Sequence, residues 1–299
     1  MIPTFVSRVS FKPISVKSVG ILLTALALAG CGNDSAVAPT ASSSASNLPS
    51  PSESPTTDFV QDYSFYFVSE TAQGFRLIRE VQQVSKVEND LGDDKGFNSL
   101  IMLVNGQLPP FDGDHRTLWN NGTKVNSVTN TDGAATVDLT LGRISLGSES
   151  ELRAIDQIVW TLMDNDPSIT SVQFTIDGKV SESLAGHVDL TQPFVRAPGY
   201  EVLATVWIDL LDRSDVRNPV SITGSACTFE ANVAWELTKV GDVVRSGSTT
   251  AATACPDRSD WTIELGDLVA GNYVLKVSDY SPKDGAPIFE DTKSFTVVD

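Results

Sequence analysis

The clearest helix in the sequence reads SESELRAIDQIVWTL and runs from Ser148 to Leu162. Ser148 and Glu151 have the spacing of a capping box, which predicts that the helix begins there. Apolar side chains then recur at helical spacing and predict one buried face. They are Leu152, Ile155, Ile158, Val159 and Leu162.

Short β segments surround this helix. Alternating and β-branched residues predict strands at 63–68, 75–84, 123–128, 135–139 and 172–176. Asp132-Gly133 predicts a hairpin turn, and Asp177-Gly178 a second turn. Another helix is predicted over 94–105, with Gly106 as its stop. The order ββαββαβ predicts an α+β layer of two helices on one sheet, and we assign it to residues 58–197.

Residues 198–299 show a different pattern. Apolar and polar side chains alternate in short runs, and Gly, Asp and Pro mark the turns between them. One run has Val206, Ile208 and Leu210 on one side and Trp207 and Asp209 on the other. A second run has Phe229, Ala231, Val233, Trp235 and Leu237 on one side. This alternation predicts an all-β sandwich of two sheets with about seven strands.

Residues 1–30 have the organisation of a secretory signal peptide. A basic segment is followed by an uncharged apolar run over 19–30, which is shorter than the roughly 20 residues that span a bilayer. The run ends in Leu28-Ala29-Gly30-Cys31, which resembles the lipobox of bacterial lipoproteins. The resemblance implies that Cys31 receives a diacylglyceryl group and becomes the mature N-terminus. An ordinary signal peptide with a coincidental cysteine is the alternative.

Residues 31–57 are dominated by Ser, Ala, Pro and Thr. Such a segment buries too little surface to offset the entropy of ordering it, so we expect a disordered linker. Its mean reach is on the order of 30 Å. The sequence therefore predicts a lipoprotein that is anchored by acyl chains such as palmitate on the extracytoplasmic face of the cell membrane.

The chain is strongly acidic. Its 299 residues contain 21 Lys and Arg against 38 Asp and Glu, for a net charge of −17. Phosphate groups repel such a surface, which disfavours nucleic-acid binding and cationic recognition of a membrane. Membrane association is expected through the N-terminal lipid anchor.

Cys227 and Cys255 are the two cysteines that remain once Cys31 carries lipid. An even pair in an exported protein predicts a disulfide, and two free thiols are the alternative. No cluster of cysteine and histidine has a usual zinc spacing.

The sequence singles out no catalytic, cofactor-binding or metal-binding residue. His115 ends the acidic stretch Asp112-Gly113-Asp114-His115, where a solvated loop is preferred over a metal site. Residues 89–94 have the composition of a calcium loop without its ligand spacing. His187 is expected to be packed or on the surface. Motifs of serine hydrolases and phosphate-binding loops are absent.

Trp119 and Trp207 are predicted to pack in a core or on a sheet face. If either side chain is exposed, it becomes the first candidate for contact with a partner, because tryptophan is enriched at the centres of protein interfaces.

Several motifs carry a family resemblance. LWNNGTKVNSV at 118–128, DGAATVDL at 132–139, IDQIVWTL at 155–162 and VQF at 172–174 together resemble the GerMN domain of bacterial sporulation and germination proteins. The resemblance implies a sheet-and-two-helix fold similar to the ring-building motifs of envelope secretion machines. It transfers no catalytic residue.

The sandwich region is similar to another domain of these proteins. The segments PVSITG at 219–224, FEANV at 229–233, GNY at 271–273, SPKDG at 281–285 and FTV at 295–297 resemble the C-terminal immunoglobulin-like domain of spore-germination lipoproteins.

Together the resemblances imply a non-catalytic envelope lipoprotein, of the sporulation and germination type, that acts as an interaction scaffold or regulatory module. The expected partner is an envelope protein or a wall polymer, with no cofactor. The alternatives are a cell-wall protein that binds glycan or peptide on the sandwich face, an accessory lipoprotein of a sensor-kinase system, and an enzyme.

Overall fold

The computed structural model of the chain describes residues 60–71, 74–85, 92–119 and 122–298. The predicted signal peptide, Cys31, the linker at 31–57 and residues 89–91 of the acidic stretch lie outside the described residues. None of the described helices is long and apolar enough to cross a membrane.

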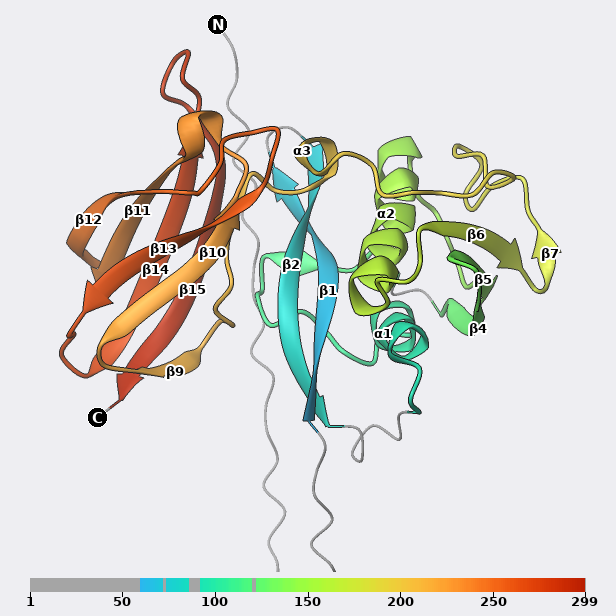
Figure 1. Cartoon of the computed structure of the whole chain (residues 1–299), viewed down its shortest axis with the longest axis horizontal. Coiled ribbons are helices and arrows are strands. Elements are labelled where there is room, and N and C mark those ends of the chain that lie inside the picture. Colours follow the sequence, from blue (N-terminus) through green and yellow to red (C-terminus); the bar gives the residue numbers. More distant parts are fainter. Residues whose placement is uncertain (1–59, 72–73, 86–91, 120–121, 299) are drawn as a thin grey trace, which may run out of the picture. The chain divides into compact units, whose positions relative to one another are not determined.

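The first domain contains the following elements (Figure 1). They are β1 (Val60–Thr71), β2 (Gly74–Ser85), α1 (Lys95–Val104), β3 (His115–Arg116), β4 (Lys124–Thr131), β5 (Ala134–Thr140), α2 (Ser148–Asn165), β6 (Ser171–Ile176) and β7 (Lys179–Val180). The strands form two sheets, with strand orders β2-β1-β3 and β4-β5-β6-β7. The α+β class with two helices is confirmed, but the strands that we expected in one sheet are divided between two.

The two sheets separate because helix α2 stands between them (Figure 1). Its apolar residues Ile155, Ile158 and Leu162 pack in a core with the inner face of β4–β6. A polar stripe on another side of the helix faces β1, and its members Gln157, Thr161 and Asn165 are all buried. The helix therefore covers both sheets at once.

The start of α2 differs from the sequence prediction. Gly147 is the N-cap and Ser148 the first helical residue, so the predicted capping box is wrong. Glu151 is instead buried and accepts hydrogen bonds from the backbone amides of Leu184 and Ala185. Leu152, predicted on the buried face, is 40% exposed because its side of the helix meets solvent.

The predicted turns and the first helix are confirmed. Asp132-Gly133 joins β4 to β5 and Asp177-Gly178 joins β6 to β7, and all four residues have positive φ. Helix α1 begins after Asp94, whose side chain accepts a hydrogen bond from the amide of Phe97 over 2.8 Å.

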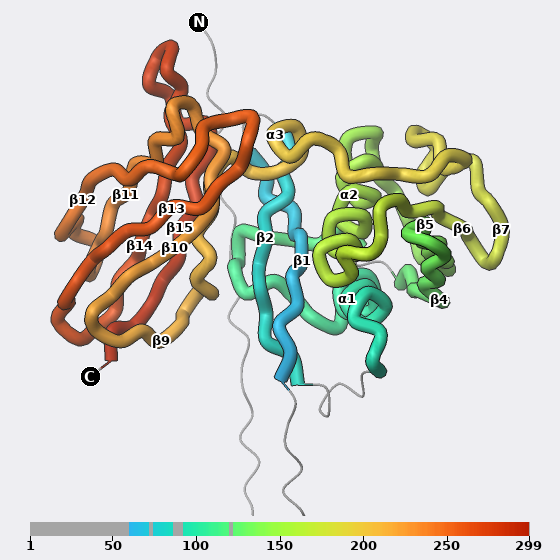
Figure 2. Tube along the Cα trace, viewed as in Figure 1, coloured from blue at the N-terminus to red at the C-terminus, as the bar shows by residue number. Residues whose placement is uncertain are grey.

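The second domain is an immunoglobulin-like β-sandwich, as predicted (Figure 2). It follows the short helix α3 (Gly199–Val202). Its elements are β8 (Val206–Ile208), β9 (Ser214–Arg217), β10 (Val220–Ala226), the 3₁₀ turn η1 (Phe229–Ala231), β11 (Asn232–Lys239), β12 (Asp242–Thr250), β13 (Ser259–Gly266), β14 (Gly271–Tyr280) and β15 (Pro287–Val298). One sheet has the order β13-β10-β8 and the other β12-β11-β14-β15-β9.

One detail of the predicted alternation is wrong. Phe229 lies in η1 and is 59% exposed, because positive φ angles at Glu230 and Ala231 turn the backbone before β11 begins. Trp207, which was expected opposite Val206 and Ile208 and in a packing position, is buried, as are its two neighbours. The strand that carries them, β8, is covered on both faces.

A second apolar core, separate from the one beside α2, extends through both domains. It includes Phe65 and Leu77 from the β1–β2 hairpin and Ile222, Trp261 and Phe295 from the sandwich. The connecting segment joins the hairpin directly, because the amide of Ala204 donates a hydrogen bond to the carbonyl of Leu77 over 2.8 Å. The described residues accordingly lie in one compact unit.

Candidate functional site

Five ionisable side chains meet where the two domains join, and we call them the junction network. Glu80 lies on β2, Asp112 and His115 lie at the entrance to β3, and Asp291 and Lys293 lie on β15. Each residue is at most 7% exposed. A buried charge is stable only when it is paired, so the contacts among these groups decide what the network does.

Glu80 organises the first-domain half of the junction network. Its Oε1 accepts a hydrogen bond from Nδ1 of His115 over 2.6 Å, and its Oε2 accepts one from the amide of Phe111 over 2.9 Å. Gln82 donates a third over 2.8 Å. Burial alone would raise the pKa of Glu80, but these bonds hold that pKa below its ordinary value.

Lys293 connects the two domains. Its Nζ donates to Oδ2 of Asp112 over 2.5 Å and to Oδ1 of Asp291 over 2.8 Å. The second oxygen of Asp291 accepts a hydrogen bond from the amide of Ile208 over 2.7 Å. One ammonium group thus binds a carboxylate from each domain.

The electrostatic response of each group follows from its partners. Burial would lower the pKa of Lys293, but its two carboxylate partners raise that pKa above the ordinary value. Burial raises the pKa of Asp291, and Lys293 offsets this only in part. At Asp112 the order reverses, since the bonds from Lys293 outweigh burial and lower the pKa. The network therefore keeps Lys293 charged in the protein interior.

The same residues have the spacing of a metal site. One ligand atom each from Asp112, His115 and Asp291 lies within 4.8 Å of the others. Imidazole and carboxylate groups are common ligands of divalent metals. Here, however, Nζ of Lys293 contacts both carboxylates and supplies the positive charge between them. In this arrangement Asp112, Asp291 and Lys293 form a buried ion-pair cluster that joins the two domains.

The prediction of a solvated loop at residues 112–115 is wrong. Asp112 and His115 are buried because β15 covers them, and Lys293 of that strand lies 181 positions after Asp112. A signal for this site is present in the sequence. Asp291 and Lys293 share the inward side of β15 with Phe289, Phe295 and Val297, and charged residues on an apolar strand face indicate buried pairing.

A second set of contacts reinforces the junction. Arg79 of β2 forms an ion pair with Asp209 over 2.9 Å. The guanidinium carbon of Arg258 lies 3.8 Å from the centre of the Trp207 ring, and Arg258 also donates a hydrogen bond to the carbonyl of Ala204. These cationic groups hold the segment that links the domains.

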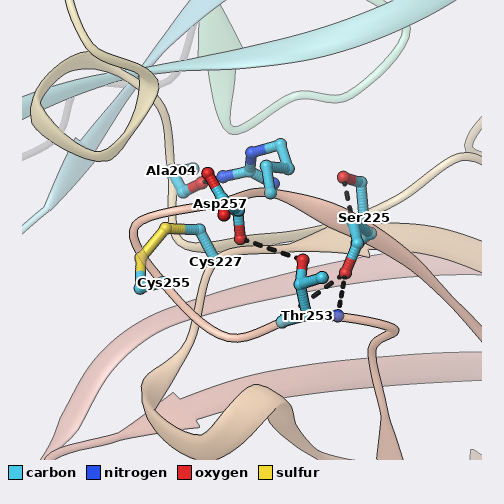
Figure 3. The surroundings of a disulfide bond; sticks show 8 residues. Ala204, Ser225, Cys227, Thr253, Cys255 and Asp257 are labelled. Carbon is cyan, nitrogen blue, oxygen red and sulfur yellow. Dashed lines mark hydrogen bonds between the residues drawn. A yellow bond between two sulfur atoms is a disulfide. The ribbon is translucent and has the colours of Figure 1, made fainter.

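Cys227 and Cys255 form a disulfide, as the sequence predicts (Figure 3). The amide of Cys227 donates to the carbonyl of Thr205 over 2.7 Å. The bond fixes the loop that carries Thr253, Asp257 and Arg258, and it therefore supports the contact between Arg258 and the linking segment.

The structure places both candidate tryptophans in the interior. Trp119 is 1% exposed in the core beside α2, and its Nε1 donates a hydrogen bond to the carbonyl of Ala154 over 2.8 Å. Trp207 is 2% exposed under Arg258. Both therefore occupy packing positions and are not surface contacts in this structure.

His187 lies at the surface of the first domain, with its side chain 45% exposed. Its Nδ1 donates a hydrogen bond to Oε2 of Glu151 over 2.9 Å. Together with Glu151, His187 stabilises the loop around Leu184. It does not contact the junction network.

Comparison with known proteins finds a family-model match in each domain. Residues 64–182 match the family model Germane, described as sporulation and spore germination. Residues 211–286 match the family model Gmad2, described as an immunoglobulin-like domain of bacterial spore germination. No curated protein shows significant similarity to the chain.

Several solved structures are similar over about half of the chain. The tandem GerMN domains of the sporulation protein GerM from Bacillus subtilis share 21% identity, with a TM-score of 0.37 and coverage of 50% of each chain. The first GerMN domain of that protein shares 20% identity over 46% of this chain and 98% of the other, with a TM-score of 0.36. A lipoprotein from Clostridium perfringens shares 22% identity over 48% of this chain and 93% of the other, with a TM-score of 0.31.

Proposed function

Because the chain carries a Germane domain at residues 64–182 and a Gmad2 immunoglobulin-like domain at residues 211–286, we propose that it is a non-catalytic scaffold of the cell envelope in sporulation or spore germination. Both family descriptions concern spore formation or germination, and neither names an enzymatic activity. In this proposal the two domains bind envelope proteins and hold them in a fixed arrangement.

The junction between the domains is the observation that carries the proposal. A scaffold must hold its binding surfaces at a constant distance and angle. The shared core, the Lys293 bridge and the Arg79–Asp209 pair join the domains at several separate points. Domains connected only by a linker would move independently. The contacts at this junction instead favour one fixed orientation of the second domain relative to the first.

The same proposal includes the lipid anchor at Cys31. Fractionation of cells that produce the full chain and a Cys31→Ser variant tests it. We expect the natural chain in the membrane fraction, with labelled palmitate incorporated, and the variant outside that fraction without label. A natural chain that is released without label would overturn the anchor.

The scaffold itself is tested by capture of its partner in intact cells. Because the core is shared, deletion of either domain would expose apolar surface and confuse the result. We would instead place a photocrosslinking residue singly at exposed Val180 of the first domain or exposed Tyr280 of the second. The captured molecules are then identified by mass spectrometry.

A reproducible envelope protein captured from one of these positions supports the scaffold. The Cys31→Ser chain carrying the same probe is the control, because it lacks the anchor but keeps the surface. If only wall fragments are captured, the scaffold is wrong and a wall-binding function takes its place.

A further inference from the structure

Exposed valines gather at one end of the β-sandwich. The hairpin between β11 and β12 presents Val240, Val243 and Val244, which are 95%, 57% and 49% exposed, and the loop before β14 presents Val269, which is 77% exposed. The loop and the hairpin are neighbours, since Nζ of Lys239 lies 3.4 Å from the carbonyl oxygen of Val269. We call these four side chains the valine end.

The backbone at Val240 is unusual. Lys239 pairs with Asp242, so Val240 and Gly241 form a two-residue hairpin loop, and their φ angles are 55° and 88°. Both angles are positive, as in a type I′ turn, where Asn or Asp followed by Gly is preferred. A β-branched residue with positive φ is a genuine outlier, because its side chain crowds the backbone.

The chain itself provides the comparison. Its other two-residue hairpin loops with positive φ at both positions, within the described residues, are Asp132-Gly133 and Asp177-Gly178. Both follow the preferred turn chemistry. Val240 departs from it and also leaves an apolar side chain almost fully in water. Backbone strain of this kind is concentrated at functional positions. At this position the strained backbone places the apolar side chain of Val240 at the surface.

The composition of the valine end favours a lipid surface over a protein surface. Hot spots of protein interfaces are enriched in Trp, Tyr and Arg, whereas Val is under-represented there. Charges around the four valines are balanced, with Lys239 and Arg245 beside Asp242 and Asp267. This end therefore escapes the repulsion that the net charge of −17 imposes on the chain as a whole.

The attachment of the chain agrees with this orientation. The valine end lies where β14 begins and β15 ends, since Gly271 pairs with Val297. Figure 1 shows the end of β15 and the start of β1 at the same lower edge of the view. Between Cys31 and Val60 there are 28 residues (32–59), with a mean reach on the order of 30 Å if flexible. A lipid anchor at Cys31 would hold this edge near the bilayer.

We propose that the valine end docks on the bilayer surface, with the side chains of Val240 and Val269 inserted among the lipids. The orientation argument rests on the anchor at Cys31 that forms part of the proposed function. Four valines give weak binding on their own, but the tether converts it into an intramolecular contact at high effective concentration. Docking would fix which side of the compact two-domain unit faces away from the membrane.

The experiment uses the full lipidated chain in vesicles of phosphatidylethanolamine and phosphatidylglycerol. A photoreactive diazirine residue is placed at position 269, or at exposed Val180 of the first domain as the matched control position. After flotation and illumination, mass spectrometry measures the lipid adducts. We expect adducts at position 269 and about tenfold fewer at position 180.

The variant Val240→Asp separates docking from folding. It gives the hairpin loop the preferred Asp-Gly sequence and relieves the strain at position 240, so the unfolding temperature should rise by roughly 2–4 °C. It also removes one inserted valine, so lipid capture at position 269 should fall by about tenfold. Val180→Asp is the control variant and should leave capture at position 269 unchanged.

Two results with the lipidated chain would overturn the docking proposal. One is a chain that floats with the vesicles but yields no lipid adduct at position 269. The other is capture of a protein or of a second copy of the chain in place of lipid. A chain that does not float shows that the anchor has failed, and docking is then measured with the unlipidated full chain at high vesicle concentration. Lipid adducts at position 269 in that case still support docking, and their absence overturns it.

Discussion

Asn165 satisfies both backbone polar groups of Ser64, although 101 positions separate the two residues. Its Oδ1 accepts from the Ser64 amide over 3.1 Å, and its Nδ2 donates to the Ser64 carbonyl over 2.7 Å. Thr161 accepts from the amide of Tyr66, and Gln157 donates to the carbonyl of Tyr66. Residues four apart on the helix, such as Thr161 and Asn165, are separated by about 6 Å along its axis, and residues two apart on the strand, such as Ser64 and Tyr66, by about 6.7 Å. Because the two spacings match, side chains of α2 can bond the backbone of β1 where a neighbouring strand would otherwise do so.

Replacement of Asn165 by leucine should therefore destabilise the fold strongly. Asn165→Leu leaves the amide and carbonyl of Ser64 without their partner in the interior, and we expect a loss of about 2–4 kcal/mol in the free energy of unfolding. Urea denaturation measures it. Asn232→Leu at an exposed position of β11 is the control, with a change within about 0.5 kcal/mol. Equal effects of the two variants would contradict the strand-like role of α2.

The Lys293 bridge predicts a large penalty for removal of one charge. Lys293→Met leaves two buried carboxylates facing each other, and the expected loss is about 3–5 kcal/mol. The double variant Lys293→Met with Asp291→Asn removes one of those charges and should recover part of the loss. Denaturant titration of both variants gives the values. Lys276→Met is the control, because Lys276 and its partner Glu236 are 30% and 43% exposed and such a pair contributes about 0–1 kcal/mol.

Acid should weaken the fold in part through Glu80. Because hydrogen bonds in the folded state lower its pKa, Glu80 stabilises the fold above its ordinary pKa of 4.5, and this contribution is lost as pH falls through the lowered value. Asp291 has a raised pKa and acts in the opposite direction. In Glu80→Gln the Glu80 contribution is absent at every pH. We expect the stability difference between natural chain and variant to shrink as pH falls from about 5 to 3. A difference that stays constant over this range would contradict the assignment.

Glu151 should control the order of the loop that follows β7. Its carboxylate accepts from the amides of Leu184, Ala185 and His187. Burial would raise its pKa, but these bonds lower it. In Glu151→Gln one oxygen becomes an NH₂ group that cannot accept, and the remaining oxygen is uncharged and accepts more weakly. The hydrogen bonds of the three amides are therefore lost or weakened, and these amides should exchange with deuterium faster. The amides of Ser64 and Tyr66, which α2 holds elsewhere, should keep their protection. Loss of protection at all five amides would indicate general unfolding instead.

The disulfide predicts a further stability difference. The 28-residue separation of Cys227 and Cys255 corresponds to about 3–4 kcal/mol in the chain-entropy model. The double variant Cys227→Ser with Cys255→Ser should lose about this much in denaturant titration under oxidising conditions. Under reducing conditions the natural chain should approach the variant. A variant as stable as the oxidised chain would show that the bond does not support the loop.

Local patterns predicted much of the fold. Asp-Gly pairs identified two hairpins, and alternation identified the sandwich, because turn chemistry and side-chain period act over a few residues. The buried role of His115 was missed, because its burial depends on β15, a strand much later in the sequence. The role of the polar stripe of α2 could not be predicted from the sequence either. Gln157, Thr161 and Asn165 have the same helical spacing as the apolar face, but only the unpaired edge of β1 gives them a role.

The shared core has a consequence for the timing of folding. Strand β15 supplies Asp291, Lys293 and Phe295 to a junction whose other half lies on β2 and β3. When the chain is made or exported from its N-terminus, the β1–β2 hairpin therefore emerges about 200 residues before the strand that completes its surroundings. Its apolar face stays uncovered during that interval. The contacts of the hairpin with the sandwich therefore form only after the last strand has emerged, whereas the core beside α2 contains residues of the first domain alone.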